Sequence, residues 1–150
     1  MSVHAIDLFM QYFNAFETAL RNDAWDSVGA LLAEDAHYSV AGVPFACEID
    51  GRAAILQAFQ RSTSAFDATM DFRMLEILSI ARLSAGHIRV EMISGYGRHD
   101  EGAVTAPVTV EVEAGDKQIR SLGDRYDPEL TAPALTWLSI HAGDANPSYV

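Results

Sequence analysis

From His87 to Asp127 the chain reads HIRVEMISGYGRHDEGAVTAPVTVEVEAGDKQIRSLGDRYD. Along this stretch, and along residues 71–83 before it, polar and apolar side chains alternate with a period near 2, which is typical of strands with one buried face. The alternation forms four segments, at 71–83, 87–98, 104–113 and 117–126. Because the breaks between them are short and turn-like, antiparallel hairpins are expected. The stretch therefore predicts a meandering antiparallel sheet.

Helices are predicted before this sheet. Apolar residues at positions 6, 9, 10, 13, 16 and 20 follow the three-and-four spacing of a long amphipathic helix. Asp23 is expected to cap a second helix over 25–32, which meets the first at a tight corner. A short strand at 36–40 and a loop through Cys47 follow, and Gly51 opens a third helix that extends to residue 66.

After the sheet, Pro128 ends the last strand. Residues 130–141 predict a weak helix broken near Pro133, followed by a frayed tail to Val150. Helices first and strands after predict an α+β domain, in which three N-terminal helices cover one face of a curved, mostly antiparallel sheet. A single domain is expected over residues 1–150, with its core at about 5–128 and a C-terminal extension at 129–150.

The composition limits the partners of the chain. Its 150 residues carry 10 Lys and Arg against 21 Asp and Glu, a formal net charge of -11. This charge argues against nucleic acid and anionic membranes as partners, so a neutral small molecule is expected. No apolar run approaches the roughly 20 residues that cross a bilayer, and the amino terminus lacks the basic region of a secretory signal. With Cys47 as the only cysteine, a cytoplasmic location is expected.

Four stretches together resemble a known superfamily. They are residues 13–20 leading into Asn22-Asp23-Ala24-Trp25, then 31–36, then Gly51-Arg52-Ala53-Ala54-Ile55 with Phe59, and finally 119–128. In this order and spacing the chain resembles the nuclear transport factor 2-like superfamily, and within it the SnoaL-like group. The resemblance implies a cone-shaped, cystatin-like fold whose bent sheet wraps a long helix around an apolar pocket. Members are often dimers, and their activities include steroid isomerisation, polyketide cyclisation, epoxide hydrolysis and dehydration.

Asp124 is the first candidate for chemistry. It shares a strand face with Leu122 and Tyr126, where a carboxylate is costly unless it has a partner. A carboxyl group in an apolar pocket has a raised pKa and can carry protons. The resemblance also implies an acid/base aspartate at this place on the last strand. The alternative is structural: Asp124 pairs with Arg120, which regular alternation places on the same face, or with an arginine of a neighbouring strand.

Catalytic groups that other members of the superfamily use are missing from the aligned positions of this chain. The second aspartate and the arginine of the superfamily's epoxide hydrolases align with Ile93 and Gly95, which argues against epoxide hydrolysis. The proton-transfer groups of its steroid isomerases align with Phe16, Val40 and Thr109. Steroid isomerisation by that route is therefore not expected, although these three residues can still line a substrate pocket.

Further pocket residues follow from strand alternation. Tyr38 shares a face with Val40 and is expected to orient a substrate by a hydrogen bond to a carbonyl or enolate oxygen, or else to be a core tyrosine with its hydroxyl at the rim. Tyr96 and Arg98 offer a polar end to the wall, although Arg98 borders a turn and can simply be solvated. The predicted substrate-binding residues are Phe16, Val40, Tyr96, Arg98, Thr109, Leu122 and Tyr126.

Neither a metal site nor a cofactor is expected. His87 and Glu91 lie on one strand face but roughly 13 Å apart, too far to share an ion. The chain also has no phosphate-binding glycine loop and no nucleophile elbow.

Two functions remain open. The first is a cofactor-free isomerase, cyclase or dehydratase with Asp124 as acid/base and Tyr38 as orienting group. The second is a non-catalytic ligand-binding or dimerisation module. A row of valines at 104, 108, 110 and 112 also predicts a homodimer through the sheet, unless the row faces the helices and is ordinary core.

Overall fold

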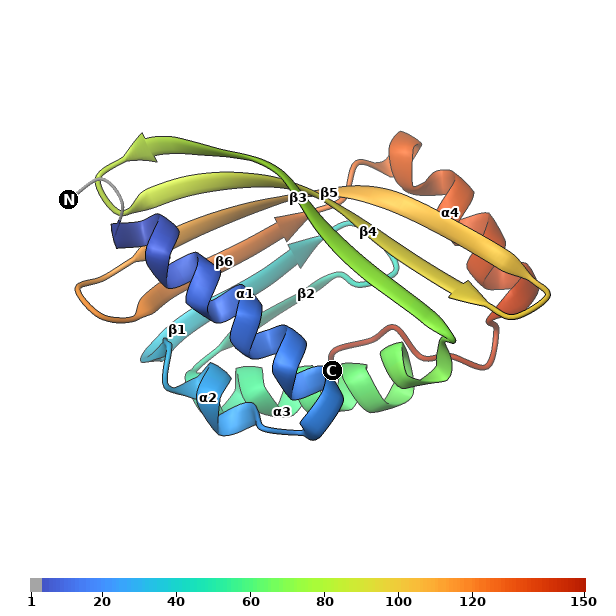
Figure 1. Ribbon diagram of the computed structural model, residues 1–150, viewed down its shortest axis with the longest axis horizontal. Helices are drawn as coiled ribbons and strands as arrows, with labels where there is room; N and C mark the ends of the chain where they lie inside the picture. Colours follow the sequence, from blue (N-terminus) through green and yellow to red (C-terminus); the bar gives the residue numbers. More distant parts are fainter. Residues whose placement is uncertain (1–3) are drawn as a thin grey trace.

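A computed structural model describes residues 4–150 of the chain; residues 1–3, the start of the predicted domain and of the stretch that was compared with a secretory signal, lie outside the described residues. Six strands form one sheet in the order β2-β1-β6-β5-β4-β3 (Figure 1). All neighbouring pairs are antiparallel except β1 and β6, which are parallel. The elements are α1 (His4–Asn22), α2 (Trp25–Gly29), β1 (Leu32–Ala41), β2 (Cys47–Asp50), α3 (Arg52–Ala65), the 3-10 turn η1 (Asp67–Thr69), β3 (Phe72–Ser84), β4 (His87–Arg98), β5 (Gly102–Ala114), β6 (Ile119–Arg125) and α4 (Pro128–His141).

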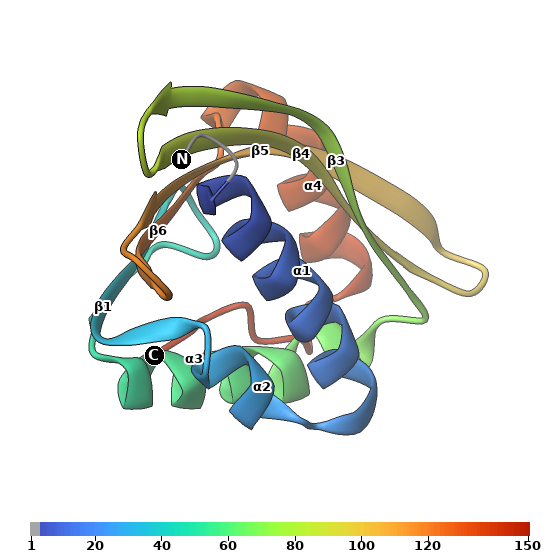
Figure 2. The same ribbon diagram turned by 60° about the vertical axis from the view of Figure 1, so that its left-hand side comes forward.

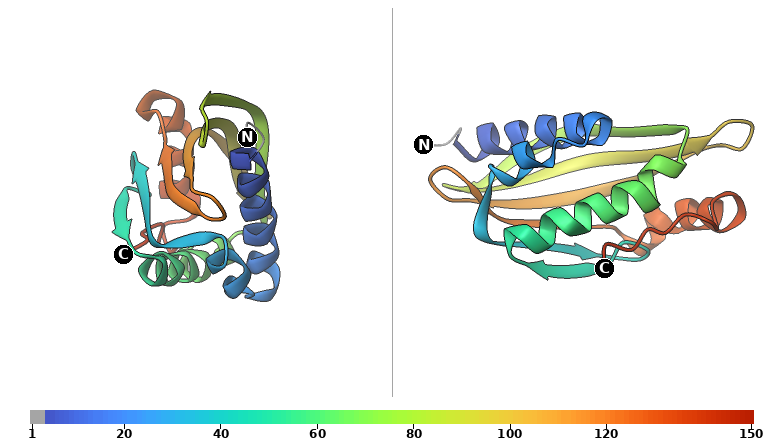
Figure 3. Two further views of the ribbon diagram at one scale, coloured as in Figure 1. Left: turned by 90° about the vertical axis from the view of Figure 1, so that its left-hand side faces the viewer. Right: turned by 90° about the horizontal axis from the view of Figure 1, so that it is seen from below.

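The helices and the curved sheet enclose the core. The sheet bends over α1, and α2 and α3 lie beneath it (Figure 2). Seen from below, α1 and α3 cover the same face of the sheet, and α4 lies at one end of it (Figure 3). Phe9 of α1 and Phe59 of α3 are 2% and 1% exposed, and burying a side chain of this kind contributes roughly 1.5–3 kcal/mol. The predicted α+β cone is confirmed.

The corner between α1 and α2 forms differently from the prediction. Asp23 has a left-handed backbone (φ 61°), and Ala24, without a side-chain cap, precedes α2. The Asp23 carboxylate instead accepts a hydrogen bond from the indole Nε1 of Trp25 at 2.8 Å. Asp23 therefore stabilises the turn by holding the buried Trp25, not by capping the helix.

The four predicted strands of the meander are confirmed as β3 to β6, but the segment around Cys47 is corrected. Cys47–Asp50 was predicted to be a loop and is the edge strand β2, which pairs antiparallel with β1. Four residues are too few to show a period in the sequence, and β1 supplies the pairing partner that decides their conformation.

The valine row belongs to the core. Val108, Val110 and Val112 are 5%, 6% and 0% exposed and pack in the main hydrophobic cluster under the helices. Val104, near the start of β5, is only half-buried. Of the two predicted alternatives, a dimer surface or ordinary core, the row is therefore ordinary core. It gives no reason for a dimer through the sheet.

The C-terminal extension is more ordered than predicted. Asp127 caps α4 by accepting hydrogen bonds from the backbone N–H groups of Glu129 and Leu130 at 2.9 and 3.2 Å. The helix continues through Pro133 instead of breaking there. The segment after α4 then returns to the helices, where the N–H of Asn146 donates to the carbonyl of Ala65 at 2.9 Å. The tail that was predicted to fray therefore packs against the helices.

Candidate functional site

A cavity of about 90 Å³ lies between the helices and the concave face of the sheet. Its wall is mostly aromatic and aliphatic, with two carboxylate-bearing regions: Asp124 on β6, and an ion-paired group made of Glu17, Asp67 and Arg73. The lining residues are Phe9, Tyr12, Phe13, Phe16, Glu17, Tyr38, Phe45, Phe59, Ser62, Thr63, Asp67, Arg73, Leu75, Met92, Ser94, Tyr96, Val108, Val110, Leu122, Asp124, Tyr126 and Tyr149.

Asp124 lies among apolar side chains. The strand register places it between Val40 of β1 and Val110 of β5. Burial raises the pKa of the Asp124 carboxyl from 3.8 to about 6, because the charged form loses its hydration there. A hydrogen bond from Tyr38 opposes this rise only in part. Near neutral pH the group can therefore both take and give a proton.

The predicted ion pair with Arg120 does not form. Opposite Glu113 and Ala114 of β5, β6 carries one extra residue, since Glu113 pairs with Ser121 and Ala114 with Ile119. Arg120 is that extra residue, and this bulge turns its side chain to solvent. Among residues 4–150 no Lys, Arg or His forms an ion pair with Asp124.

Tyr38 holds Asp124 in place. Its hydroxyl donates a hydrogen bond to Oδ2 of Asp124 at 2.9 Å. The ring is 3% exposed and stands edge-on to Phe59, with centroids 5.0 Å apart and planes at 87°. Burial and the nearby Asp124 charge raise the pKa of Tyr38 well above its ordinary value, so the hydroxyl keeps its proton. Among residues 4–150 no second donor engages Asp124, and its Oδ1 accepts no hydrogen bond from them.

Four of the seven predicted substrate-binding residues line this cavity together with Asp124 and Tyr38. They come from α1, from β4, from β6 and from the residue after β6, and they are Phe16, Tyr96, Leu122 and Tyr126. The structure brings them together because the sheet curves around α1, so that side chains from β1, β4 and β6 converge on one space.

The other three lie outside the cavity. Val40 is buried in the core cluster, 4% exposed, beside Asp124 but not on the cavity wall. Thr109 points to the opposite face of β5 from Val110 and donates a hydrogen bond to Glu91 Oε2 at 3.2 Å. Arg98 ends β4 and pairs with Asp144 at 3.0 Å, so it neither binds at the cavity nor holds Asp124 ionised.

The two positions aligned with the acid and the arginine of the superfamily's epoxide hydrolases, Ile93 and Gly95, do not line the cavity. The cavity is lined by Met92 and Ser94, and strand alternation turns their neighbours Ile93 and Gly95 to the other face. The wall beside Asp124 is therefore still without a second carboxylate on β4.

Two groups in the cavity were not predicted. Arg73 of β3 donates to Asp67 at 2.6 Å and to Glu17 at 2.8 Å, and so ties β3 to η1 and α1. One signal was available for this group, because Glu17 falls between Phe13 and Leu20 at helical spacing, on the apolar face of α1. Tyr149 is the second, and no local pattern in the sequence points to it.

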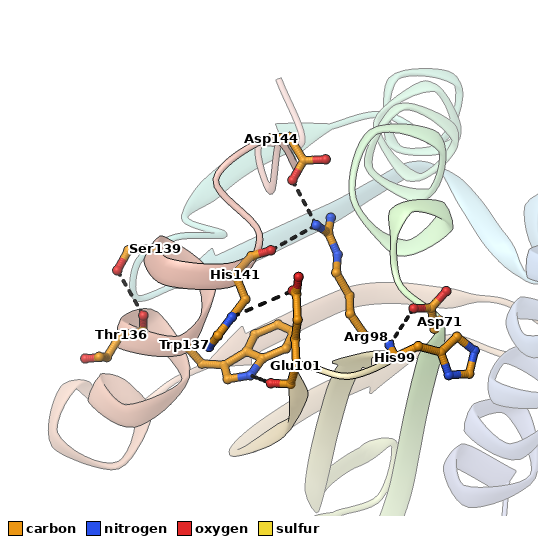
Figure 4. A network of polar contacts seen from close by, with 9 residues as sticks. All are labelled: Asp71, Arg98, His99, Glu101, Thr136, Trp137, Ser139, His141 and Asp144. Atoms are coloured by element: carbon orange, nitrogen blue, oxygen red, sulfur yellow. Dashed lines mark hydrogen bonds and ion pairs between the residues drawn. The ribbon is translucent and has the colours of Figure 1, made fainter.

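Tyr149 reaches the cavity because the C-terminal segment is anchored at the far end of the sheet. Figure 4 shows Arg98 between Asp144 and the backbone of His141, to whose carbonyl it donates at 2.9 Å. Trp137 donates to the carbonyl of Glu101 at 2.9 Å from the same helix (Figure 4). These contacts fix the end of α4 against the β4–β5 turn and direct the chain back toward α3.

Two further kinds of feature, a metal-binding cluster and a membrane-spanning helix, are absent from the described part of the chain. Within residues 4–150 no three His, Cys, Asp or Glu side chains are grouped so as to hold a metal ion. None of the helices in that range combines the length and the hydropathy that a membrane-spanning helix requires.

Comparison with known proteins shows what the fold is shared with. No protein-family model and no curated protein matches the chain. Among solved structures, it resembles an LEH-like epoxide hydrolase of M. tuberculosis (22% identity, 92% of this chain and 94% of that chain, TM-score 0.65). It also resembles a candidate polyketide cyclase of Xanthomonas campestris (23% identity over 92% of this chain and 96% of that chain, TM-score 0.62). A third similar structure is a nuclear transport factor 2-like protein of Burkholderia xenovorans (15% identity over 89% of this chain and 97% of that chain, TM-score 0.63). The chain therefore has the nuclear transport factor 2-like fold.

Proposed function

We propose that the protein is an enzyme that moves a proton within a neutral carbonyl compound, with Asp124 as the acid/base. The observation that carries this proposal is an aspartate without an ion pair in an aromatic cavity, with its pKa raised to about 6 and one carboxylate oxygen left for a ligand. A purely structural aspartate in such a place costs stability without any return. The isomerase, cyclase and dehydratase activities expected for SnoaL-like proteins all need such a group.

The proton transfer is balanced within one substrate. Oδ1 of ionised Asp124 takes a proton from a carbon next to a carbonyl group, and the electrons of the broken C–H bond move onto the carbonyl oxygen as an enolate. Where a C=C bond is conjugated with the enolate, Asp124 returns the proton to the far carbon of that bond while the carbonyl re-forms, and the shifted C=C bond gives isomerisation. In a cyclase the enolate carbon attacks a second carbonyl, and the new alkoxide takes the proton from Asp124. In a dehydratase the hydroxyl on the β-carbon takes that proton and leaves as water, while the enolate electrons form the C=C bond and the carbonyl is restored.

Tyr38 acts as a positioning residue in this scheme. Its hydroxyl is engaged by Asp124, and therefore the enolate needs other donors. Tyr12 and Tyr96 line the same cavity, and burial raises their pKa values well above the ordinary value, so both hydroxyls are protonated. In a space that excludes most water, a hydroxyl donor aimed at the developing oxyanion stabilises it more than in solution.

A non-catalytic ligand-binding module is the second candidate. The observation in its favour is that, among residues 4–150, the other two carboxylates that line the cavity, Glu17 and Asp67, are both paired with Arg73. Asp124 would then serve only to hydrogen-bond a polar group of the ligand.

Exchange of carbon-bound hydrogen for deuterium distinguishes the catalytic function from the non-catalytic ligand-binding function. Small single-ring ketones such as cyclopentanone and cyclohexanone are incubated in D₂O with the protein, and loss of the α-proton signal is followed by ¹H NMR. An enzyme exchanges these protons faster than buffer does, the rate rises with the ionised fraction of Asp124 around pH 6, and Asp124→Asn abolishes it.

Asp116→Asn is the matched control, because Asp116 is an exposed carboxylate in the β5–β6 turn. It is expected to exchange the ketone protons at the wild-type rate. If wild type and Asp124→Asn bind the ketones equally and exchange their protons at the buffer rate, the catalytic proposal fails and the binding module remains.

A further inference from the structure

Tyr149 completes the pocket from a segment that no other pocket residue shares. Its ring lies 5.5 Å from that of Tyr38, 6.4 Å from Phe59 and 6.5 Å from Phe45, measured between centroids. It lines the cavity together with Asp124. The hydrogen-bonded pair on which the proposed chemistry depends is therefore covered, on one side, by a residue next to the end of the described chain.

The attachment of this segment is weak compared with that of the other walls. Phe16 and Phe59 lie on helices, and Tyr38 and Tyr96 on strands, but residues 142–150 belong to no helix or strand. One backbone hydrogen bond, from Asn146 to Ala65, joins the segment to α3. The carbonyl of Tyr149 itself accepts only a long contact from the exposed side chain of Arg61, at 3.4 Å.

Tyr149 packs against the core, but its segment has little backbone pairing, and such a segment opens locally at lower cost than a strand of the sheet does. Its inner end is fixed, because Arg98 binds the carbonyl of His141 and the carboxylate of Asp144. Motion is therefore confined to the residues beyond Asp144, and Tyr149 is the side chain that such motion removes from the cavity.

The size of the cavity gives the motion a purpose. With Tyr149 in place the volume is about 90 Å³, whereas pockets for small-molecule ligands usually measure roughly 300–1,000 Å³. The backbone of α1 and of the strands is held by regular hydrogen bonds, so these walls cannot supply the missing space. The wall formed by Tyr149 is the one that can move to enlarge the cavity.

We infer that residues 145–150 are the movable wall of this pocket and that Tyr149 sets the size of the ligand that it admits. Small neutral ligands fit with Tyr149 inside, and the ring then shields Asp124 from water. Larger ones, of two or more fused rings, are admitted only when the ring swings out. The inference rests on the ligand-binding part of the proposed function but not on its catalytic part.

Nile red, a neutral fused-ring dye that fluoresces in apolar surroundings, is the probe. Tyr149→Ala is expected to bind it about tenfold more tightly than wild type, with one dye for each chain. Tyr149→Phe, which keeps the ring, and Val150→Ala, a change on the same segment at a residue 70% exposed, are expected to match wild type. Equal affinity in wild type and Tyr149→Ala overturns the inference.

A second measurement, on wild-type protein, tests the inference without a substitution that could gain dye binding by partial unfolding. Hydrogen exchange of the Asn146 and Tyr149 amides is expected to be at least tenfold faster than that of amides in β5, because only the segment opens. Protection equal to that of β5 contradicts a movable wall.

The two proposals fail separately. If Asp124→Asn retains ketone exchange while Tyr149→Ala gains the dye, the catalytic role falls and the wall stands. If Asp124→Asn abolishes exchange and Tyr149→Ala gains nothing, the wall falls and the catalytic role stands.

Discussion

Asp124→Asn is expected to stabilise the protein at pH 8 and hardly at all at pH 4. Burial raises the pKa of the Asp124 carboxyl from 3.8 to about 6, so the folded protein holds this proton more tightly than the unfolded chain does. Unfolding therefore becomes easier as the pH rises from about 4 to about 6, and the loss persists above that range. At 1.36 kcal/mol for each pH unit, the loss is about 3 kcal/mol.

Asparagine has nearly the shape of aspartate and can accept the hydrogen bond from Tyr38, but it has no charge to desolvate. The variant therefore escapes the loss. At pH 8 its free energy of unfolding is expected to exceed that of wild type by about 3 kcal/mol, which raises Tm by about 6–12 °C at this chain length. At pH 4 the difference is expected to be within about 1 kcal/mol.

Urea unfolding at both pH values measures the difference, and comparing two variants at each pH cancels every other titrating group. Asp116→Asn, on an exposed turn, is the control and is expected to leave stability within about 0.5 kcal/mol of wild type at both pH values. The reasoning is refuted if Asp124→Asn changes stability equally at pH 4 and pH 8, since the effect would then not come from the charge.

Other substitutions test the remaining contacts. Tyr38→Phe removes the hydroxyl that lowers the pKa of Asp124, so carbon-detected NMR is expected to show that pKa moving above 6 and the exchange profile moving with it. Arg73→Met leaves two partly buried carboxylates unpaired and is expected to cost about 3–5 kcal/mol at pH 7 in urea unfolding; a loss below 1 kcal/mol would show that solvent already screens them. Val112→Ala opens a hole at a fully buried site and is expected to lower Tm, with a loss of about 2 kcal/mol, whereas an exposed valine row would give almost none.

The alternation between His87 and Asp127 was enough to predict the strands because one face of each is buried against the helices. The same alternation predicted that Asp124, Leu122 and Tyr126 share a face, and all three line the cavity. Where the alternation is interrupted, the prediction failed. Arg120 sits in a bulge that the sequence does not mark, and its side chain therefore points away from the carboxylate it was expected to bind.

Which face of the sheet the helices cover could not be settled from the valine row, because both answers give the same pattern. The structure shows Val110 and Val112 under the helices. That arrangement depends on packing between distant segments and not on any local run of residues.

Local patterns in the sequence predicted most of the helices and strands and singled out Asp124 as an inward carboxylate, because period and burial are properties of neighbouring residues. The tertiary structure alone decided what surrounds that acid. Tyr38 and Asp124 are 86 residues apart in the chain and meet through the parallel pairing of β1 and β6. Tyr149 joins them from a segment with no period at all, because a few contacts at the end of α4 direct it there. Contacts between segments so far apart are fixed by the packing of the whole chain, which local spacing does not encode.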